Sequence, residues 1–599
     1  MGRCFWPSAT REISPQPASP SGFAQLSLVF VPEPLMLRLP FLSSLFSLTA
    51  ILLLPASAQD APAAKQEKTS TAQLVENFEK VPEKPVYVVR NQITHSPRRP
   101  SSAFDPKVEK GQLVLCPGSG GAHSSVAWPR LVEGRHRRVE AHFSFRLGGG
   151  AQGLSYALLA TSRFGAEGPA FQLYRAKGLP GRKASYPDWD EPNLWGSLAV
   201  AFDGENPPTD DPFDERGNVH GQPQHEVSLH WDGRELRNRQ SPVDFTKGEP
   251  VKARVLVDFV SGGAELTVEL NGVKVYEREF LPHVFPYESR IGFGARGENR
   301  GAIASLDDVA VQWQLACERF PAPMLQRTFR SEWMGIQKHS TVTGTFELPD
   351  NRPYERILMS IHLKPLVKRD EWDRLGHVSL IDKEGRIWEL ARLLTPFMLW
   401  GAEYRWDVDV THFRHLLQGK VQLSASGGGN VGDGFALDLD FHYYKRPKGV
   451  APLPELLGLG YLWNQAVSFR KGKRDSWPKP VTLTPPAQTQ RVVVNCCVTG
   501  HGVQEFRPSP RILKVQDKAY ENTLWTTDCY LNPYRPQYGT WKYNRAGWGP
   551  GSIGRTWRVD VSEQWAARAP LRFEYIPEDK TFDKWASHQL VAYAIYYAE

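Results

Sequence analysis

The chain has 599 residues, a length typical of three or four domains. Hydrophobic residues make up 41% of it, which is ample for packed cores and excludes a disordered or collagen-like protein. The net charge of +7, from 72 basic and 65 acidic residues, is too small over this length to indicate nucleic-acid binding. Six cysteines are too few for a dense disulfide scaffold or a zinc ribbon.

An apolar segment near the start of the chain, residues 36–58, has the pattern of a secretory signal peptide. It carries one basic residue, Arg38, then an apolar core and an Ala-x-Ala ending at Ala58. The alternative is a membrane anchor, which Pro40 and Pro55 within the segment disfavour. We expect cleavage after Ala58 and a secreted or periplasmic location, where cysteines can pair.

The position of this signal predicts that residues 1–35 are untranslated or non-structural, because a signal rarely begins so far along a chain. Translation then begins at Met36. Residues 59–73 are rich in small and charged side chains, which is typical of a flexible linker. No other stretch is apolar over the length that a membrane helix needs, so we expect no integral membrane span in the mature chain.

Alternation of apolar and polar residues, the mark of half-buried strands, recurs along the rest of the chain. It is clearest in Val139–Leu147, Leu266–Val275, Leu437–Tyr443, Val559–Val561 and Phe573–Tyr575. Asn271-Gly272 predicts a hairpin with a two-residue turn, because both residues readily adopt positive φ. Helical periodicity is nearly absent, and Thr411–Leu417 is the best candidate for a short helical turn. The pattern predicts an all-β protein built of sandwiches or jelly rolls.

Two proline-rich hinges, residues 320–324 and 446–454, divide this β-rich part of the chain. We therefore expect a first domain at residues 74–318, a second at residues 325–448 and a third at residues 449–599.

An apolar strand that ends in oxygen-bearing side chains lies in the first domain. Ser197–Phe202 is followed by Asp203, Asn206 and Asp211. Carboxylate and amide oxygens gathered in one loop are the ligands that calcium prefers, so these three residues are candidate calcium ligands. The alternative is a sandwich whose acidic loop is only solvated.

This segment resembles the metal loop of the legume-type lectins, and Gly153–Leu158 and Ile291–Ala295 are similar to strands of the same family. The resemblance implies a concanavalin-like β-sandwich. Two positions depart from the family. Ala201 stands where an acidic residue would complete a transition-metal site, and Gln152 stands where the family has an Asp that contacts sugar. The resemblance therefore implies calcium binding more than sugar binding.

Two blocks in the second half have specific motifs. The first is Asp-Glu-Trp-Asp-Arg at residues 370–374, ahead of the apolar run at residues 378–381. The second consists of Thr-Gly-His-Gly at residues 499–502 with Glu-Phe at 505–506, and of the Gly-Trp-Gly-Pro-Gly segment at residues 547–551. Both blocks resemble the peptide-N-glycosidase F family, bacterial enzymes that release N-linked glycans from asparagine. The blocks follow the family's order and spacing, which implies two tandem jelly-roll β-sandwiches.

The resemblance also implies a cleft between the two jelly rolls with one carboxylate from each. Asp373 takes the place of the family's principal catalytic carboxylate, and Glu505 matches its carboxylate in the second jelly roll. The positions that match residues lining the cleft are Trp372, Arg374, Arg545 and Trp548. Hydrolysis of the amide between GlcNAc and Asn needs an activated water and a stabilised oxyanion. The implied activity is an exported amidase that acts on N-glycosylated proteins or glycopeptides and uses no cofactor in catalysis.

Two positions depart from the peptide-N-glycosidase F pattern. Counted without gaps from Leu416, a further acidic position of the family falls on Gly428. Either Asp433 substitutes for it, or the substrate differs, or amidase activity is lost. The family's disulfide is also altered, because Cys529 has its match but the partner position is Gly549.

Two other functions and two cysteine pairings stay open at this point. A glycan-binding protein that keeps the cleft without full catalysis is supported by Gly428. A copper monooxygenase of the peptidylglycine-hydroxylating type shares paired jelly rolls, but the second half has no His-x-His pair to bind copper. Cys529 could pair with Cys496 or Cys497, and Cys116 with Cys317.

Overall fold

The computed structural model describes residues 72–79, 87–88, 106–118, 122–168, 189–204, 225–297, 301–335, 340–366, 372–397, 403–427, 434–534, 537 and 540–598. The predicted signal at residues 36–58, residues 1–35 and all but the last two residues of the linker 59–73 lie outside this description. Among the described residues, no helix has both the length and the apolar character that a membrane crossing requires.

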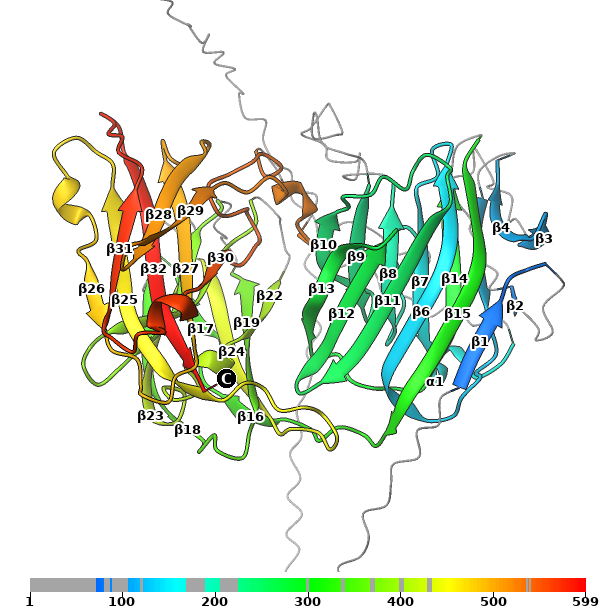
Figure 1. Cartoon of the computed structure of the whole chain (residues 1–599), viewed down its shortest axis with the longest axis horizontal. Helices are drawn as coiled ribbons and strands as arrows, with labels where there is room; N and C mark the ends of the chain where they lie inside the picture. The colour runs from blue at the N-terminus through cyan, green and yellow to red at the C-terminus, as the bar shows by residue number, and fades with distance from the viewer. Residues whose placement is uncertain are drawn as a thin grey trace, which may run out of the picture. The chain divides into compact units, whose positions relative to one another are not determined.

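The described secondary structure is almost entirely antiparallel β-sheet, which confirms the predicted all-β fold (Figure 1). A first sandwich has two sheets around one core, and α1 (Thr161–Phe164) follows one of its strands. In order of hydrogen-bonded neighbours, one sheet contains β13 (Val273–Pro282), β12 (Gly263–Leu270), β11 (Val251–Val260), β6 (Arg135–Gly148), β15 (Ile303–Cys317), β4 (Gln112–Pro117) and β3 (Lys107–Glu109), with β1 (Ala72–Glu76) also paired to β15. The other contains β10 (Arg234–Gln240), β9 (Glu226–Trp231), β8 (Leu198–Asp203), β7 (Gly153–Ala160), β14 (Ser289–Gly297), β5 (Ala122–Ala127) and β2 (Tyr87–Val88).

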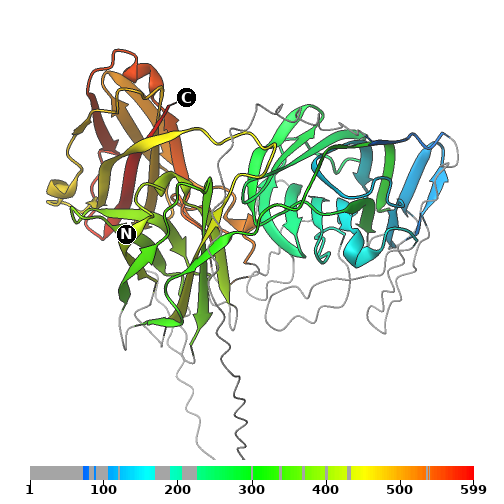
Figure 2. The same cartoon turned by 90° about the horizontal axis from the view of Figure 1, so that it is seen from below.

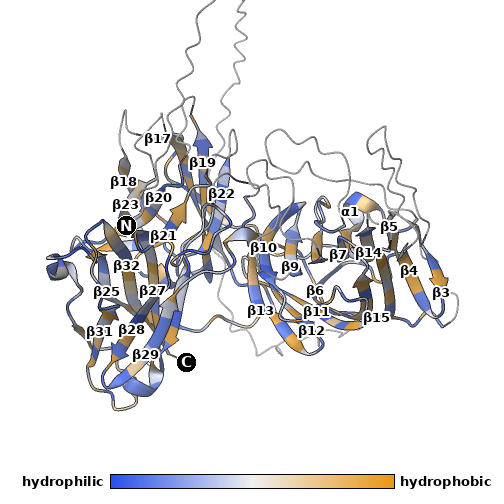
Figure 3. Cartoon of the chain, turned by 90° about the horizontal axis from the view of Figure 1, so that it is seen from above, coloured by the Kyte–Doolittle hydropathy of each residue, from blue (hydrophilic) through white to orange (hydrophobic). Residues whose placement is uncertain are grey.

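The core of this sandwich follows from the period-two pattern of its strands. Phe143 and Phe145 of β6 are buried, as are Val255 and Val257 of the neighbouring β11. Successive side chains of a strand point to opposite faces, so alternate residues of both strands reach the same core. Figure 3 shows this as alternating apolar and polar colour along the strands, and Figure 2 shows the same sandwich from below.

The predicted hairpin is confirmed between β12 and β13. Asn271 and Gly272 have φ of 49° and 79°, the positive values that a two-residue turn of this hand requires. Gly272 meets no atom where a Cβ would stand, so its backbone conformation, not space, selects glycine here.

Two jelly rolls follow, and their strands are ordered alike. In each, the first, eighth, third and sixth strands form one sheet, and the second, seventh, fourth and fifth form the other. The first jelly roll pairs β17 (Glu332–Met334), β24 (Phe435–Tyr444), β19 (Arg356–Pro365) and β22 (Tyr404–Asp409), with β16 (Met324–Arg327) also on β24, against β18 (Thr341–Leu348), β23 (Gly419–Ser426), β20 (Leu375–Ile381) and β21 (Ile387–Leu394). The second pairs β25 (Leu456–Ser468), β32 (Ala586–Tyr597), β27 (Arg491–Gly502) and β30 (Thr556–Asp560) against β26 (Val481–Leu483), β31 (Leu571–Pro577), β28 (Ser509–Val515) and β29 (Lys518–Leu524).

Short 3-10 turns complete the described elements: η1 (Thr411–Phe413), η2 (Arg474–Ser476), η3 (Cys529–Leu531) and η4 (Ser562–Trp565). The helical turn predicted at Thr411–Leu417 is therefore present but ends earlier, at Phe413.

The two jelly rolls are joined by backbone and side-chain contacts along β21 and β22. Leu393 forms an isolated antiparallel bridge with Ile553, and the amide of Leu394 donates to the carbonyl of Ser552 at 3.0 Å. The indole of Trp406 donates to the carbonyl of Gly551, also at 3.0 Å. The segment that the family resemblance singled out around Gly551 is thus fixed directly against the first jelly roll.

The expected pairing of Cys116 with Cys317 is wrong. Cys116 lies opposite Ala304 near the start of β15, whereas Cys317 ends that strand, 13 residues further on. At about 3.3 Å per residue the two are separated by about 40 Å, and a disulfide needs Cα atoms within about 7 Å. Cys496, Cys497 and Cys529 are thiols as well, so neither alternative for Cys529 is formed.

Candidate active site

The tripeptide Trp372-Asp373-Arg374 lies directly before β20 and is held by one buried hydroxyl. Oγ1 of Thr395 donates to the carbonyl of Trp372 at 3.0 Å and accepts from the amide of Arg374 at 2.7 Å. The amide of Thr395 in turn donates to the carbonyl of Arg374 at 3.0 Å. These bonds fix both sides of Asp373 against the end of β21, so the carboxylate has a defined position.

Glu505 lies in the turn that follows β27 in the second jelly roll. Its amide donates to the carbonyl of Gly502 at 3.1 Å, and its carbonyl accepts from the amide of Ala546 at 2.9 Å. At Gly500 a Cβ would lie 2.6 Å from the Cβ of Ala546, which is closer than real side-chain atoms approach. Glycine at this position therefore allows the strand and the segment after Arg545 to touch.

Arg545 joins the two carboxylates. Its Nη1 donates to Oδ2 of Asp373 at 3.3 Å and also to Oε1 of Glu505. Its Nη2 donates to the carbonyl and to Oγ1 of Thr540, at 3.1 and 2.8 Å. The side chain of Arg545 is 3% exposed, against 20% and 23% for the two acids. A buried cation thus holds one carboxylate from each jelly roll at a surface that solvent reaches.

Aromatic rings pack around the guanidinium of Arg545. The guanidinium carbon lies 4.5 Å from the ring centroid of Trp548 and 4.7 Å from that of Phe506. The indole of Trp548 donates to the carbonyl of Gly500 at 2.8 Å, and the ring of His501 stacks on it. Trp548 is buried, so it supports Arg545 from below and offers no open stacking face.

The pKa values of both carboxyl groups are raised. Burial raises the pKa of Asp373 and outweighs the lowering by the charges of Arg545 and Arg374. Burial also raises the pKa of Glu505, with a further increase from the negative charge of Asp373 and an opposing decrease from Arg545. Two acids that share one cation and repel each other are suited to hold one proton between them, so that one serves as base and the other as acid.

Exposed aromatic side chains gather near this cluster. The described residues include eleven exposed large hydrophobic side chains, and four of them flank the site in sequence or contact its turns. They are Trp372, Phe506, Tyr543 and Trp585, with exposed fractions from 47% to 64%. The carbonyl of Trp585 accepts from the amide of Val503 at 3.0 Å, in the turn that carries Glu505. Open aromatic faces beside paired acids are the groups that sugar rings stack on.

The geometry therefore brings together most of the residues expected from sequence. Asp373, Glu505, Arg545 and Trp548 meet, and Trp372 and Arg374 flank Asp373 in the same loop. Gly428 and its alternative Asp433 lie outside the described residues.

Sequence reasoning missed the supporting hydroxyls of Thr395 and Thr540 and the ring of Phe506. Thr395 and Thr540 were missed because no local pattern marks a hydroxyl that holds a backbone turn.

The expected calcium ligands are only in part described. Asp203 ends β8 and lies with Glu191 and Glu226, and carboxylate oxygens of the three are within 4.8 Å of one another. Asn206 and Asp211 lie outside the described residues. Three carboxylates suit a hard cation such as calcium, so the donor set fits the predicted metal, whose binding stays a prediction. No other group of this kind occurs in the described ranges. The group of Asp203, Glu191 and Glu226 contains no histidine, which is a ligand that copper prefers.

Known proteins are similar to different parts of this chain. Residues 470–595 match a family model described as peptide-N-glycosidase F, C terminal. PNGase F, a glycosylasparaginase from Flavobacterium meningosepticum, is 21% identical over 46% of this chain and 96% of its own, with a TM-score of 0.38. PNGF-II is 11% identical over 76% and 99%, with a TM-score of 0.36. Lectin II from Ulex europaeus is 13% identical over 41% and 98%, with a TM-score of 0.26.

No curated protein matches the chain significantly by sequence. The family model covers β26 to β31, most of β32 and the turns that hold Glu505, Arg545 and Trp548. The predicted resemblance is therefore confirmed for the second jelly roll: residues 470–595 match the C-terminal domain of the peptide-N-glycosidase F family, and Asp373 lies outside the matched residues.

Proposed function

We propose that the protein is an amidase that hydrolyses the bond between GlcNAc and the side-chain nitrogen of Asn in N-glycosylated proteins or glycopeptides. The observation that carries this proposal is the single buried guanidinium of Arg545 between Asp373 and Glu505. Each jelly roll supplies one acid, both acids have raised pKa values, and exposed aromatic side chains lie next to both acids in sequence.

Asp373 is the better candidate for the base. The charge of Arg545 lowers the pKa of both acids, but Arg374 lowers only that of Asp373, and the charge of Asp373 raises the pKa of Glu505. Ionised Asp373 takes a proton from water as the water oxygen bonds to the side-chain carbonyl carbon. The carbon–nitrogen bond then breaks as Glu505 protonates the departing nitrogen. The products are an aspartate in the peptide and a glycan that ends in an amino group.

We also propose that the protein works outside the cytoplasm, in a secreted or periplasmic location. The signal-like segment at residues 36–58 supports this proposal.

The test is incubation of the purified full chain with a denatured N-glycoprotein in water enriched in heavy oxygen, followed by peptide mass analysis. We expect the glycosylated Asn to become Asp with one heavy oxygen incorporated. Asp373→Asn removes the base and should abolish the conversion. The matched control is Asp517→Asn, an exposed aspartate in the turn between β28 and β29, which should retain full activity.

A second candidate is a glycan-binding protein without catalysis, which Gly428 favours because glycine cannot replace the acidic side chain that the family has there. Binding of a glycopeptide without any conversion of Asn to Asp would support this candidate and would refute the amidase.

A further inference from the structure

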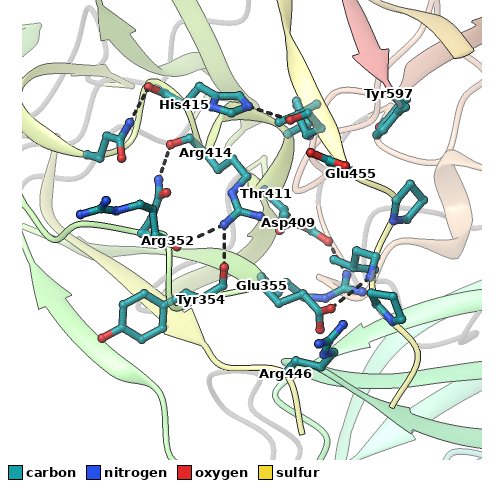
Figure 4. Close-up of a pocket in the computed structure, with 18 of the residues that line it drawn as sticks. Arg352, Tyr354, Glu355, Asp409, Thr411, Arg414, His415, Arg446, Glu455 and Tyr597 are labelled. Atoms are coloured by element: carbon teal, nitrogen blue, oxygen red, sulfur yellow. Dashed lines mark hydrogen bonds and ion pairs between the residues drawn. The ribbon is translucent and has the colours of Figure 1, made fainter. Parts of the chain in front are cut away.

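A pocket of about 1040 Å³ lies where the first jelly roll, the linker after β24 and the second jelly roll meet (Figure 4). Arg491 lines it, at the first residue of β27, whereas the turn that carries Glu505 follows the last residue of that strand, Gly502. Eleven steps of about 3.3 Å place the two ends about 36 Å apart. The pocket is therefore separate from the candidate active site.

Positive charge dominates the wall of the pocket. It has six arginines, namely Arg352, Arg356, Arg414, Arg446, Arg491 and Arg558. Its four carboxylates are Asp350, Glu355, Asp409 and Glu455, and His412 and His415 also line it. With neutral histidines the wall carries six positive and four negative charges, and Asp560 outside the wall balances one more of the arginines, so the remaining excess of one positive charge favours a ligand with negative charge.

Several of these arginines already have partners. Arg352 pairs with Asp350, and Arg356 pairs with Asp409. Arg491 pairs with Asp560, which does not line the pocket. Arg414 donates to backbone carbonyls, among them that of Tyr354 at 2.7 Å, as Figure 4 shows.

Two arginines of the wall remain available to a ligand. Arg446 and Arg558 are exposed, and no described carboxylate forms an ion pair with either, although Arg558 shares a side-chain hydrogen bond with Tyr597 of the same wall. A guanidinium offers a planar fork of donors that fits the two oxygens of a carboxylate. The pocket thus presents two such forks to a negatively charged group.

The same wall also presents an acceptor to a ligand. Oε1 of Glu355 accepts from the amide of Leu453 at 3.0 Å, which attaches the linker to the first jelly roll. Its Oε2 and Nε of Arg356 are closed to solvent, so a ligand in the pocket does not reach them. Glu455, by contrast, is an exposed carboxylate of the wall and can accept from a hydroxyl group of a ligand.

We propose that this pocket is a second, non-catalytic site that binds a carboxylated sugar. Its carboxylate would bind Arg446 and Arg558, and its hydroxyl groups would donate to Glu455. A simple anion would make no use of the Glu455 carboxylate, and a neutral sugar would make no use of the two arginine forks. The volume is at the upper end of the range for small-molecule sites and accommodates a short oligosaccharide. The proposal does not depend on amidase activity.

The test is calorimetric titration of the full chain carrying Asp373→Asn, so that no ligand is consumed. The probes are sialyllactose and a disaccharide that contains glucuronate, with lactose as the neutral control. We expect at least one acidic sugar to bind about tenfold or more tightly than lactose, because two charge-assisted contacts are added. The tighter of the two identifies the type of acidic sugar. Equal affinity for lactose and both acidic sugars overturns the proposal.

Variants locate the binding. Arg446→Gln combined with Arg558→Gln should weaken acidic-sugar binding about tenfold or more, whereas Arg558→Lys should weaken it less, because lysine keeps the charge and loses the fork. Arg572→Gln, an exposed arginine of the second jelly roll outside the pocket, is the matched control and should bind normally. Unchanged affinity in the double variant, with an unchanged melting temperature, overturns the proposal.

Two further readouts separate this site from others. Inorganic phosphate that displaces the sugar at equal concentration would indicate a simple anion site and overturn the assignment to a sugar. In an otherwise wild-type chain, the double arginine variant should leave hydrolysis of a neutral-glycan peptide unchanged. A failed amidase assay therefore does not affect this proposal, and a failed titration does not affect the amidase.

Discussion

Arg392 of β21 donates from Nη1 to the backbone carbonyl of Gln589 in β32 at 2.7 Å, so a cation of the first jelly roll is held by the backbone of the second. The side chain of Arg392 is 1% exposed. Its charge is balanced by Glu389, which is 4% exposed, with Nε and Oε1 3.0 Å apart. His377 also contacts Glu389, from Nδ1 to Oε2 at 2.5 Å.

Glu389→Gln should destabilise the fold strongly, because it leaves Arg392 buried without an opposite charge. Removing one partner of a buried pair costs about 3–5 kcal/mol. Chemical unfolding monitored by circular dichroism measures the loss. Glu384→Gln is the matched control, because Glu384 pairs with Arg386 at the surface and such pairs are worth about 0–1 kcal/mol. Equal effects of the two substitutions would contradict the assigned role of Glu389.

The same pair predicts a pH dependence of stability. Burial raises the pKa of Glu389, but Arg392 and His377 lower it more, so the folded-state value is below the ordinary one. The stabilisation is then complete above the unfolded-state pKa and is lost as the pH falls through the folded-state pKa. As the pH falls from the unfolded-state pKa to the folded-state pKa, the wild type should lose stability faster than Glu389→Gln. Melting temperatures of both proteins in buffers of decreasing pH would show the difference.

Asp373→Asn should lower kcat/KM about 100- to 10,000-fold, the usual loss when a positioned base is removed. Burial raises the folded-state pKa of Asp373, so at neutral pH its ionised form is less favourable in the folded than in the unfolded chain. The uncharged amide of the Asp373→Asn variant avoids this cost, so the substitution should not lower the melting temperature. In the wild type, kcat/KM should fall as the pH drops through that raised pKa. Full activity in a folded Asp373→Asn variant would contradict the catalytic assignment.

Removing both acids should affect the fold in a way that neither single substitution does. In Asp373→Asn or Glu505→Gln, Arg545 keeps one carboxylate. In the double variant the 3% exposed guanidinium has none, and the expected cost is about 3–5 kcal/mol. The free energies of unfolding of the three variants form a double-mutant cycle, and additivity in that cycle would show that Arg545 does not link the two acids.

Gly549→Cys should restore the disulfide that the family resemblance implies. A Cβ at residue 549 would lie 3.4 Å from the Cβ of Cys529, close to the separation found in disulfides. A closed loop of this length adds about 3 kcal/mol. Burial raises the pKa of the Cys529 thiol to about 11, so oxidation needs an added oxidant. Mass analysis and melting with and without reductant measure the bond, and Cys529→Ser in the same background is the control.

Calcium should stabilise the first sandwich. Titration of the full chain with calcium should raise its first melting transition, and a chelator should reverse the increase. Asp203→Asn removes one of three clustered carboxylates and should abolish the response. Asp517→Asn, far from β8 in sequence, is the control. A melting temperature that calcium leaves unchanged would remove the metal site.

Local patterns predicted the local structure well. Alternation placed the strands, and Asn271-Gly272 fixed one hairpin, because both depend only on neighbours in sequence. The ion pair of Asp373 with Arg545 joins residues 172 apart, and the family resemblance, not a pattern, indicated that they belong together. The grouping of Asp203 with Glu191 and Glu226 was missed because the three residues lie on separate segments and no local pattern brings them together. The pairing of Cys116 with Cys317 was wrong because the sequence does not show which ends of the strands lie together. Cys116 lies beside the start of β15, and Cys317 is the last residue of that strand.

The origin of the two acids in separate jelly rolls has a consequence for the time course of folding. Each sandwich has its own core and can acquire its strands independently, but neither has the site until Arg545 reaches Asp373. Docking of two folded units is slower than strand formation within either of them. On refolding, activity should therefore return after the β-sheet signal has recovered, with a lag that measures the docking step.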